Sequence, residues 1–115
     1  MAGESKTKLA VAASADVLVG ADDSNIEVLE VPEWGCSIRI RSLTRGEARL
    51  IGKDDMTPDQ AEVYALKTAC IEPVLNDEQA AALINNKSFG ATERVLNRIL
   101  EVSGLVPGFR PGSED

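Results

Sequence analysis

The side chains that most often carry chemistry are scarce in this chain. It contains no histidine, which removes the commonest general base and the commonest metal ligand. Cys36 and Cys70 are its only cysteines and form no CxxC pair, so we expect no zinc site. We expect two reduced thiols, with one disulfide between them as the alternative. The paired acids Asp22–Asp23 and Asp54–Asp55 do not extend into the D-x-D-x-D-G spacing of a calcium loop. No phosphate-binding glycine loop, nucleophile elbow or HExxH motif is present, and we expect no catalytic residue, cofactor or metal.

A cluster of arginines is the most conspicuous charged feature. Arg39, Arg41, Arg45 and Arg49 bring four of the chain's twelve cations into eleven residues. This pattern fits a patch that binds an acidic partner. The alternative is an outward strand face and an outward helix face whose arginines pair with acids of the same chain, since exposed ion pairs are common and weak. The acids expected in such pairs are Glu27, Glu30 and Glu47.

Trp34 is the only tryptophan of the chain. A tryptophan in a tight turn either folds back onto the core or stays exposed as an anchor for a partner. The sequence leaves both interpretations open. If Trp34 is an anchor, the adjoining Arg39 and Arg41 would share its surface, so these three residues are the candidate partner-binding site.

Length and composition are those of one globular domain, with 115 residues of which 43% are apolar. A net charge of −7 and four aromatic residues disfavour nucleic acid as a partner, because phosphate backbones must be neutralised by cations. No run approaches the ~20 apolar residues that a membrane span needs. The apolar stretch Leu9–Ala15 resembles the end of a signal peptide but is too short for one. We therefore expect neither a nucleic-acid partner nor a membrane partner.

Residues 25–44 predict a β-hairpin. Apolar and charged residues alternate on both sides of the central Trp-Gly pair, which is typical of half-buried strands. Gly35 tolerates a positive φ and marks the reversal of the chain. Two registers fit the pattern. A two-residue loop aligns Leu29 with Ile40, whereas a three-residue loop ending in a bulged Gly35 aligns Val28 with Ile40.

Four helices are expected after the hairpin, at residues 45–53, 58–72, 77–86 and 89–103. Thr44 and Thr57 each precede a Glu or Gln by three residues, as in a capping box, and Asn76 caps the third start. The last helix has an apolar stripe at i, i+1, i+4 and i+5 from Val95, and Gly104 is placed to end it. The side chains expected to face away from this stripe are Glu93, Arg94, Asn97 and Arg98.

These elements predict an α+β fold in which one β-hairpin is followed by, and packs on, about four short helices. We expect the folded domain over residues 14–106. Within it, Ser14 and Gly20 fit the cap and the stop of one helical turn, with a short strand as the alternative. Residues 1–13 lack periodicity and are expected to be a flexible tail, and the Pro- and Gly-rich residues 107–115 a disordered tail.

The hairpin and the helix after it carry a family resemblance. Val31-Pro-Glu-Trp-Gly35, continued by Ile38-Arg-Ile-Arg-Ser-Leu-Thr-Arg-Gly-Glu47, resembles the VPEWG…VxVRxLTxxE segment of small tail assembly chaperones of long-tailed (siphovirus-like) bacteriophages. Asp16-Val-Leu18 is similar to a D-I-L element upstream in that family. Residues 96–105 resemble the terminal helix of the family, so the resemblance covers about residues 15–106, the predicted folded region.

This sequence departs from the family pattern at two places. Cys36 stands where the family often has a second glycine, which leaves the turn type open. Residues 52–57 have no counterpart in the pattern. The motifs are short and contain no catalytic residue, so they do not separate a chaperone from a closely similar small tail protein.

The resemblance implies a binding function without turnover. Chaperones of this family coat the tape-measure protein, a long, largely helical and aggregation-prone rod, until tail-tube subunits polymerise around it. The resemblance further implies a protein of the host bacterial cytoplasm that is absent from the mature virion. Members of the family are commonly made in short and frameshift-extended forms, and the short form is the one absent from the virion. Contacts with the tail-tube protein and self-association are the further partners that it leaves open.

Two other classes of protein remain as alternatives. The first is a structural minor tail or head–tail component. The acidic charge and the expected lack of an extended sheet edge argue against it. The second is a bacterial protein-interaction adaptor. Neighbouring genes distinguish the second from a chaperone, because a phage chaperone would be followed by a long reading frame for a coiled-coil-like protein.

Overall fold

The computed structural model describes residues 9–53 and 55–105, and in them the fold is α+β. The predicted class, a hairpin packed on four short helices, is confirmed. The predicted tail at 107–115, and residues 1–8 of the predicted N-terminal tail, lie outside the described residues.

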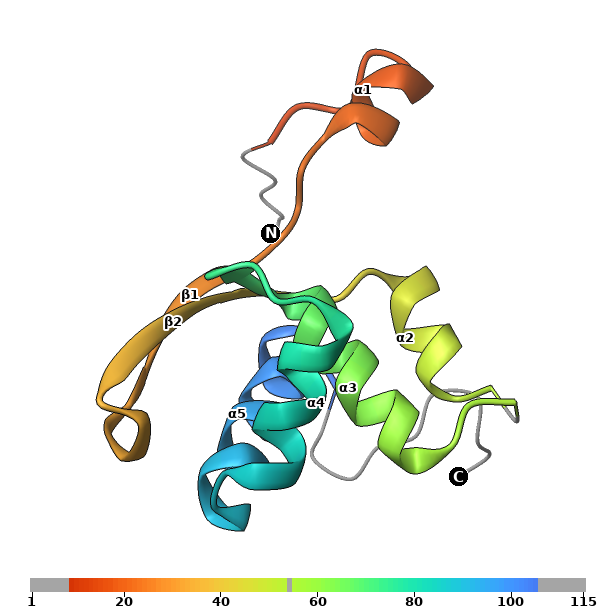
Figure 1. The fold of residues 1–115 in the computed structure, drawn as a ribbon. Helices are drawn as coiled ribbons and strands as arrows, with labels where there is room; N and C mark the ends of the chain where they lie inside the picture. The colour runs from red at the N-terminus through yellow and green to blue at the C-terminus, as the bar shows by residue number, and fades with distance from the viewer. Residues whose placement is uncertain (1–8, 54, 106–115) are drawn as a thin grey trace.

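In chain order the elements are α1 (Ala15–Gly20), β1 (Ile26–Val31), the 3-10 helix η1 (Pro32–Trp34), β2 (Cys36–Arg41), α2 (Arg45–Ile51), α3 (Pro58–Ala69), β3 (Cys70–Glu72), α4 (Asp77–Asn86) and α5 (Phe89–Val102). Helices α2 to α5 gather on one side of the long hairpin, whereas α1 stands apart (Figure 1).

The hairpin closes through a longer loop than either predicted register assumed. η1 forms one 3-10 turn, and Gly35 follows it at φ 72°, a left-handed conformation that glycine adopts without strain. Val31 pairs with Cys36, and Leu29 pairs with Ile38. Both predicted registers are therefore wrong, because the loop between the paired residues is one 3-10 turn plus a glycine and not two or three residues.

A third strand extends the sheet beyond the hairpin. β3 pairs antiparallel with β2, which gives the strand order β1-β2-β3. The helix predicted over 58–72 ends at Ala69, and the chain continues directly into β3. Cys70, expected on a helix face, is instead the buried first residue of this strand. A short apolar run such as Cys70–Ile71 fits either a helix end or a strand. Here its pairing with β2 makes it a strand.

The expected helix signals act as predicted. Thr44, Thr57 and Asn76 each cap a helix in a complete capping box, in which the side chain three residues later bonds back to the N–H of the cap. Gly104 lies at φ 83° just after α5 and donates its N–H to the Glu101 carbonyl, which satisfies one of the free carbonyls at the helix end. α1 begins at the predicted cap, so the helical alternative for that segment is the observed one.

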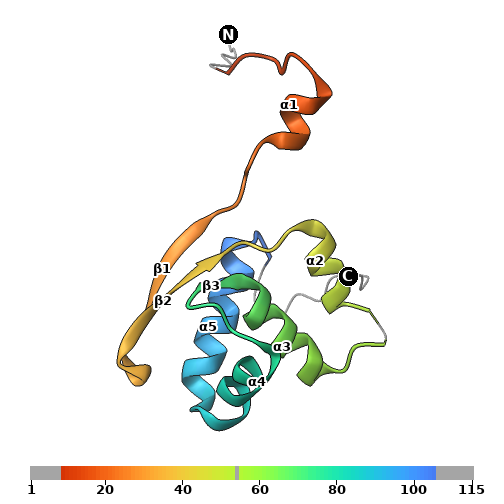
Figure 2. The ribbon, with the colours of Figure 1, turned by 45° about the horizontal axis from the view of Figure 1, so that its top comes forward.

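The hydrophobic core lies between one face of the sheet, α3 and α5. Figure 2 shows α5 as the helix next to the hairpin, with α3 and α2 farther from it. The largest fully buried side chains are Val31, Ile40, Leu66, Val95 and Ile99. Burial of each such side chain contributes about 1.5–3 kcal/mol. The predicted stripe of α5 therefore forms part of the core.

The polar side of α5 differs from the expectation that it faces away from the fold. Arg94 donates two hydrogen bonds, of 2.7 and 2.9 Å, to Glu33 in the hairpin loop. These bonds lower the pKa of Glu33 to about 2. Arg98 donates two bonds of 2.6 Å to Glu27, which shares a face of β1 with the inward-facing Leu29. The hairpin is thus tied to α5 at its tip and near the start of β1.

Candidate protein-binding surface

The structure separates Trp34 from Arg39 and Arg41, the other two residues predicted to bind a partner, which lie on one face of β2. Trp34 lies at the hairpin loop and is partly buried. Its ring packs against the hydrophobic core. The indole Nε1 is shielded from solvent and has no hydrogen-bond partner among the described residues. Trp34 thus lies where the core interpretation expects it. An unpaired buried N–H of this kind lowers the stability of the fold by about 1–3 kcal/mol.

Arg41 is engaged in a structural ion pair. Its Nη1 and Nη2 donate to the two carboxylate oxygens of Glu47 at 3.0 and 2.9 Å, and Nη1 also donates to the Ser42 carbonyl at 2.9 Å. The two side chains are only 24% and 23% exposed. The Arg41 guanidinium lowers the pKa of Glu47 to about 2, and Glu47 raises the pKa of Arg41. Arg41 therefore joins the end of β2 to the first turn of α2.

Arg39 lies on the face of the sheet opposite the helices. Directly opposite it on β1 is Val28, and Glu72 of β3 is its partner on the other side. Arg39 Nε donates to Glu72 Oε1 at 2.8 Å. We call this surface the outer sheet face. It comprises Ile26, Val28, Glu30, Ser37, Arg39, Arg41 and Glu72.

The outer sheet face is amphipathic and open to solvent. The residues Ile26 and Val28 are 57% and 53% exposed. In the Arg39–Glu72 ion pair the two side chains are 47% and 71% exposed, so solvent screens it and it contributes little stability. A partner can replace such a weak pair at small cost. The face can therefore contact apolar groups through β1 and an acidic group through Arg39.

β1 also offers a backbone edge that pairs with no other strand of the described residues. The Ser42 N–H donates to the Asn25 carbonyl at 2.8 Å. In an antiparallel pair hydrogen-bonded positions alternate, so Ile26 and Val28 turn their backbone N–H and C=O groups away from β2. The expectation that the fold lacks an extended sheet edge is wrong, because β1 is a six-residue edge strand.

Ile26 and Val28 were missed as candidate residues, although their signal is visible in the sequence. β1 reads Ile-Glu-Val-Leu-Glu-Val, which places apolar residues on both of its faces. An antiparallel strand with one solvated face normally carries polar residues there. Ile26 and Val28, at alternate positions of β1, therefore indicate an exposed apolar face from the sequence alone.

The described residues contain no group of three or more Cys, Asp or Glu side chains arranged to hold a metal ion. None of the helices in the described ranges has the length and apolar character needed to cross a bilayer. Cys36 is exposed and Cys70 is buried, and both are free thiols. Burial raises the pKa of the Cys70 thiol, which donates to the Pro73 carbonyl at 3.2 Å.

The fold and this surface define an α+β domain with an open, partly apolar sheet face. Comparisons with protein-family models, with curated proteins and with solved structures found no match for this chain.

Proposed function

We propose that this protein is a tail assembly chaperone of a long-tailed bacteriophage, acting in the host cytoplasm. In this role it binds the tape-measure protein without turnover and keeps it soluble until the tail tube polymerises around it. The resemblance of residues 31–47 supports the proposal. The structural observation that carries it is the outer sheet face, where Ile26 and Val28 expose more than half of their surface beside Arg39.

The physical properties of the chain suit this role. A helical rod exposes apolar stripes in solution, and each square ångström of apolar surface that a chaperone covers contributes about 25 cal/mol. The outer sheet face is small, so each contact is weak, but many copies along one rod would cover it together. The net charge of −7 on each copy would keep the coated rod soluble. Weak individual contacts would also let tube subunits displace the copies one by one.

Coexpression with the protein of the long downstream reading frame tests the proposal. Wild type should raise the soluble fraction of that protein and copurify with it. The double variant Ile26→Thr, Val28→Thr keeps the strand propensity of β1 but removes apolar contact. It should therefore lower both the soluble fraction of the partner and the amount that copurifies. The matched control is Phe89→Ser, because Phe89 is 78% exposed but lies at the start of α5. If the double variant raised the soluble fraction of the downstream protein as much as wild type does, the proposal would be contradicted.

A structural tail component is the second candidate, and the free edge of β1 favours it. Unpaired backbone groups on an edge strand can accept a strand from another subunit, which is a route to polymerisation. Mass spectrometry of purified virions separates the two candidates. A chaperone should be absent from mature particles in its short form, whereas stoichiometric amounts would establish the structural role.

A further inference from the structure

α1 is a helix whose apolar side chains lie in solvent. None of its six residues is buried, and Val17, Leu18 and Val19 are 54%, 67% and 84% exposed. Figures 1 and 2 show α1 standing off from the sheet and the other helices, at the end of an extended linker. An isolated helix this short is unstable in water. Its helical form therefore requires packing against another surface.

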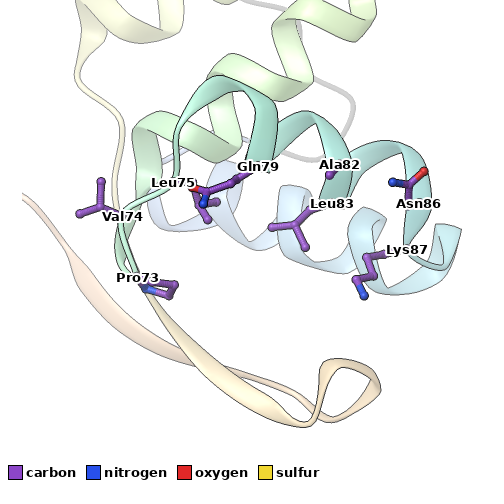
Figure 3. Close-up of a pocket in the computed structure, with 8 residues that line it drawn as sticks. All are labelled: Pro73, Val74, Leu75, Gln79, Ala82, Leu83, Asn86 and Lys87. Atoms are coloured by element: carbon purple, nitrogen blue, oxygen red, sulfur yellow. The ribbon is translucent and has the colours of Figure 1, made fainter.

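A groove along α4 offers an apolar surface of suitable size. Its volume is about 440 Å³, and it is formed by α4 and the turn that follows β3. The partly buried Leu75 and Leu83 provide its apolar floor, and Pro73 extends it toward β3 (Figure 3). This groove and α1 are two apolar surfaces of one chain, each without an observed occupant among the described residues.

The charges of the two surfaces are complementary. The arm, which we define as residues 14–25, carries three acids and no cation. Among the described residues that line the groove, Lys87 is the one with a charge, although the whole chain has a net charge of −7. Of the nearby acids, Glu72 and Asp77 are paired with Arg39 and Lys67. Glu78 lies in the first turn of α4, at the end of the helix opposite Lys87. The groove therefore has one cationic end, at Lys87, in an acidic protein.

We propose that the arm of one copy of this chain docks its α1 in the α4 groove of a second copy, and that the reciprocal contact closes a two-fold dimer. Leu18 enters the groove beside Leu83, and the acids of the arm approach Lys87. The linker at residues 21–25 continues the line of β1 off the end of the sheet, so the arm leads away from its own α4 (Figure 1). The inference does not depend on the proposed function, since it concerns copies of this chain alone.

Sedimentation velocity of the full chain over a wide concentration range tests the dimer. Wild type should show a concentration-dependent monomer–dimer equilibrium. Leu18→Asp and Lys87→Glu should each raise the dissociation constant at least about tenfold. Leu50→Asp is the matched control, since Leu50 is also exposed, at 38%, but lies on α2. Because Leu18 and Lys87 are exposed, circular-dichroism melts should show unchanged folding of the body in both variants.

Directed cross-linking locates the contact. Two variants in a Cys36→Ser background carry a new exposed thiol, one through Val19→Cys on α1 and the other through Asn86→Cys on the rim of the groove. When the two proteins are mixed and oxidised, a disulfide-linked heterodimer should form. Val19→Cys mixed with Leu50→Cys should give much less of it.

Three outcomes would overturn the inference. The first is a wild-type chain that stays monomeric at every concentration. The second is a Leu18→Asp variant that dimerises as well as wild type. The third is a chain with both Val19→Cys and Asn86→Cys that cross-links only within itself, which would show that the arm folds back on its own groove.

Discussion

Arg98 on α5 binds Glu27 on β1 through two parallel hydrogen bonds, from Nε to Oε2 and from Nη2 to Oε1, each 2.6 Å long. Arg98 Nη1 also donates to Glu101 at 2.9 Å. These bonds lower the pKa of Glu27 and raise the pKa of Arg98. The planar guanidinium fixes the direction as well as the distance of its partner. The pair therefore sets the angle at which the hairpin lies over α5.

Charge reversal tests the orienting role of this pair. Glu27→Arg and Arg98→Glu should each lower the melting temperature, because each puts two like charges together. The two reversals combined should recover part of the loss, as a double-mutant cycle would measure. Glu93→Arg, at an exposed acid of the same helix, should leave the melting temperature nearly unchanged. Additive losses in the combined variant would show that the pair contributes no coupling.

Acid should destabilise the protein partly through Glu47. Its pKa is about 2 in the folded chain against a usual value of 4.5, so the folded state binds fewer protons than the unfolded state between these values. The stability that Glu47 contributes is therefore complete above pH 4.5 and disappears as the pH falls through about 2. In Glu47→Gln, which retains a capping side chain, the free energy of unfolding should fall less steeply from pH 5 to pH 2.

Urea unfolding followed by the fluorescence of Trp34 measures this dependence, since Trp34 is the only tryptophan. Glu30→Gln serves as the control, because Glu30 is an exposed acid on β1. That variant should keep the wild-type slope. Identical slopes in wild type and Glu47→Gln would refute the assignment of the acid sensitivity to Glu47.

Trp34 should behave as a packing residue. Trp34→Ala removes a partly buried ring and should lower the free energy of unfolding by about 2–3 kcal/mol, less than a fully buried ring would cost. Trp34→Phe keeps most of the packing and removes the unpaired indole N–H, so its stability should lie within about 1 kcal/mol of wild type. Urea unfolding followed by circular dichroism measures both. Weakened tape-measure binding by Trp34→Phe at unchanged stability would instead support the anchor interpretation.

Two glycines should respond to alanine with opposite signs. Gly35 lies at φ 72°, where a β-carbon is strained, so Gly35→Ala should destabilise the protein by about 1–2 kcal/mol. Gly46 is helical, and among the described residues the nearest atom to a β-carbon there, apart from its chain neighbours and its own helix backbone, is Thr44 Oγ1 at 4.0 Å. Gly46→Ala should therefore stabilise the protein by about 0.5–1 kcal/mol. Thermal melts of the two variants beside wild type measure both effects, and a shift of the same sign in both would contradict this account.

Structural features that depend only on residues close together in the sequence were predictable. The capping boxes at Thr44 and Thr57 and the glycine stop at Gly104 each depend on side chains or backbone within one helical turn. β3 was not predictable in this way, because its strand conformation depends on pairing with β2, and Arg39 and Glu72 are 33 residues apart. Local pattern alone does not contain such distant pairings.

The candidate site was predictable only in part. Strand alternation correctly placed Arg39 on the face opposite Ile38 and Ile40. It did not show that Arg41, on the same face, is held by Glu47, because that contact depends on the angle between β2 and α2. The α4 groove arises from the packing of α4 beside the turn after β3, and no sequence pattern indicated it.

The contact between Glu27 and Arg98 spans 71 residues, which has a consequence for synthesis of the chain. The hairpin leaves the ribosome well before α5, the helix that packs against its inner face. Until α5 has been translated, Val31 and Ile40 lack part of the cover that they have in the finished fold. A nascent chain stalled before residue 89 would therefore expose apolar side chains of the strand pair, and this part of the fold can form only after Phe89–Val102 has left the ribosome.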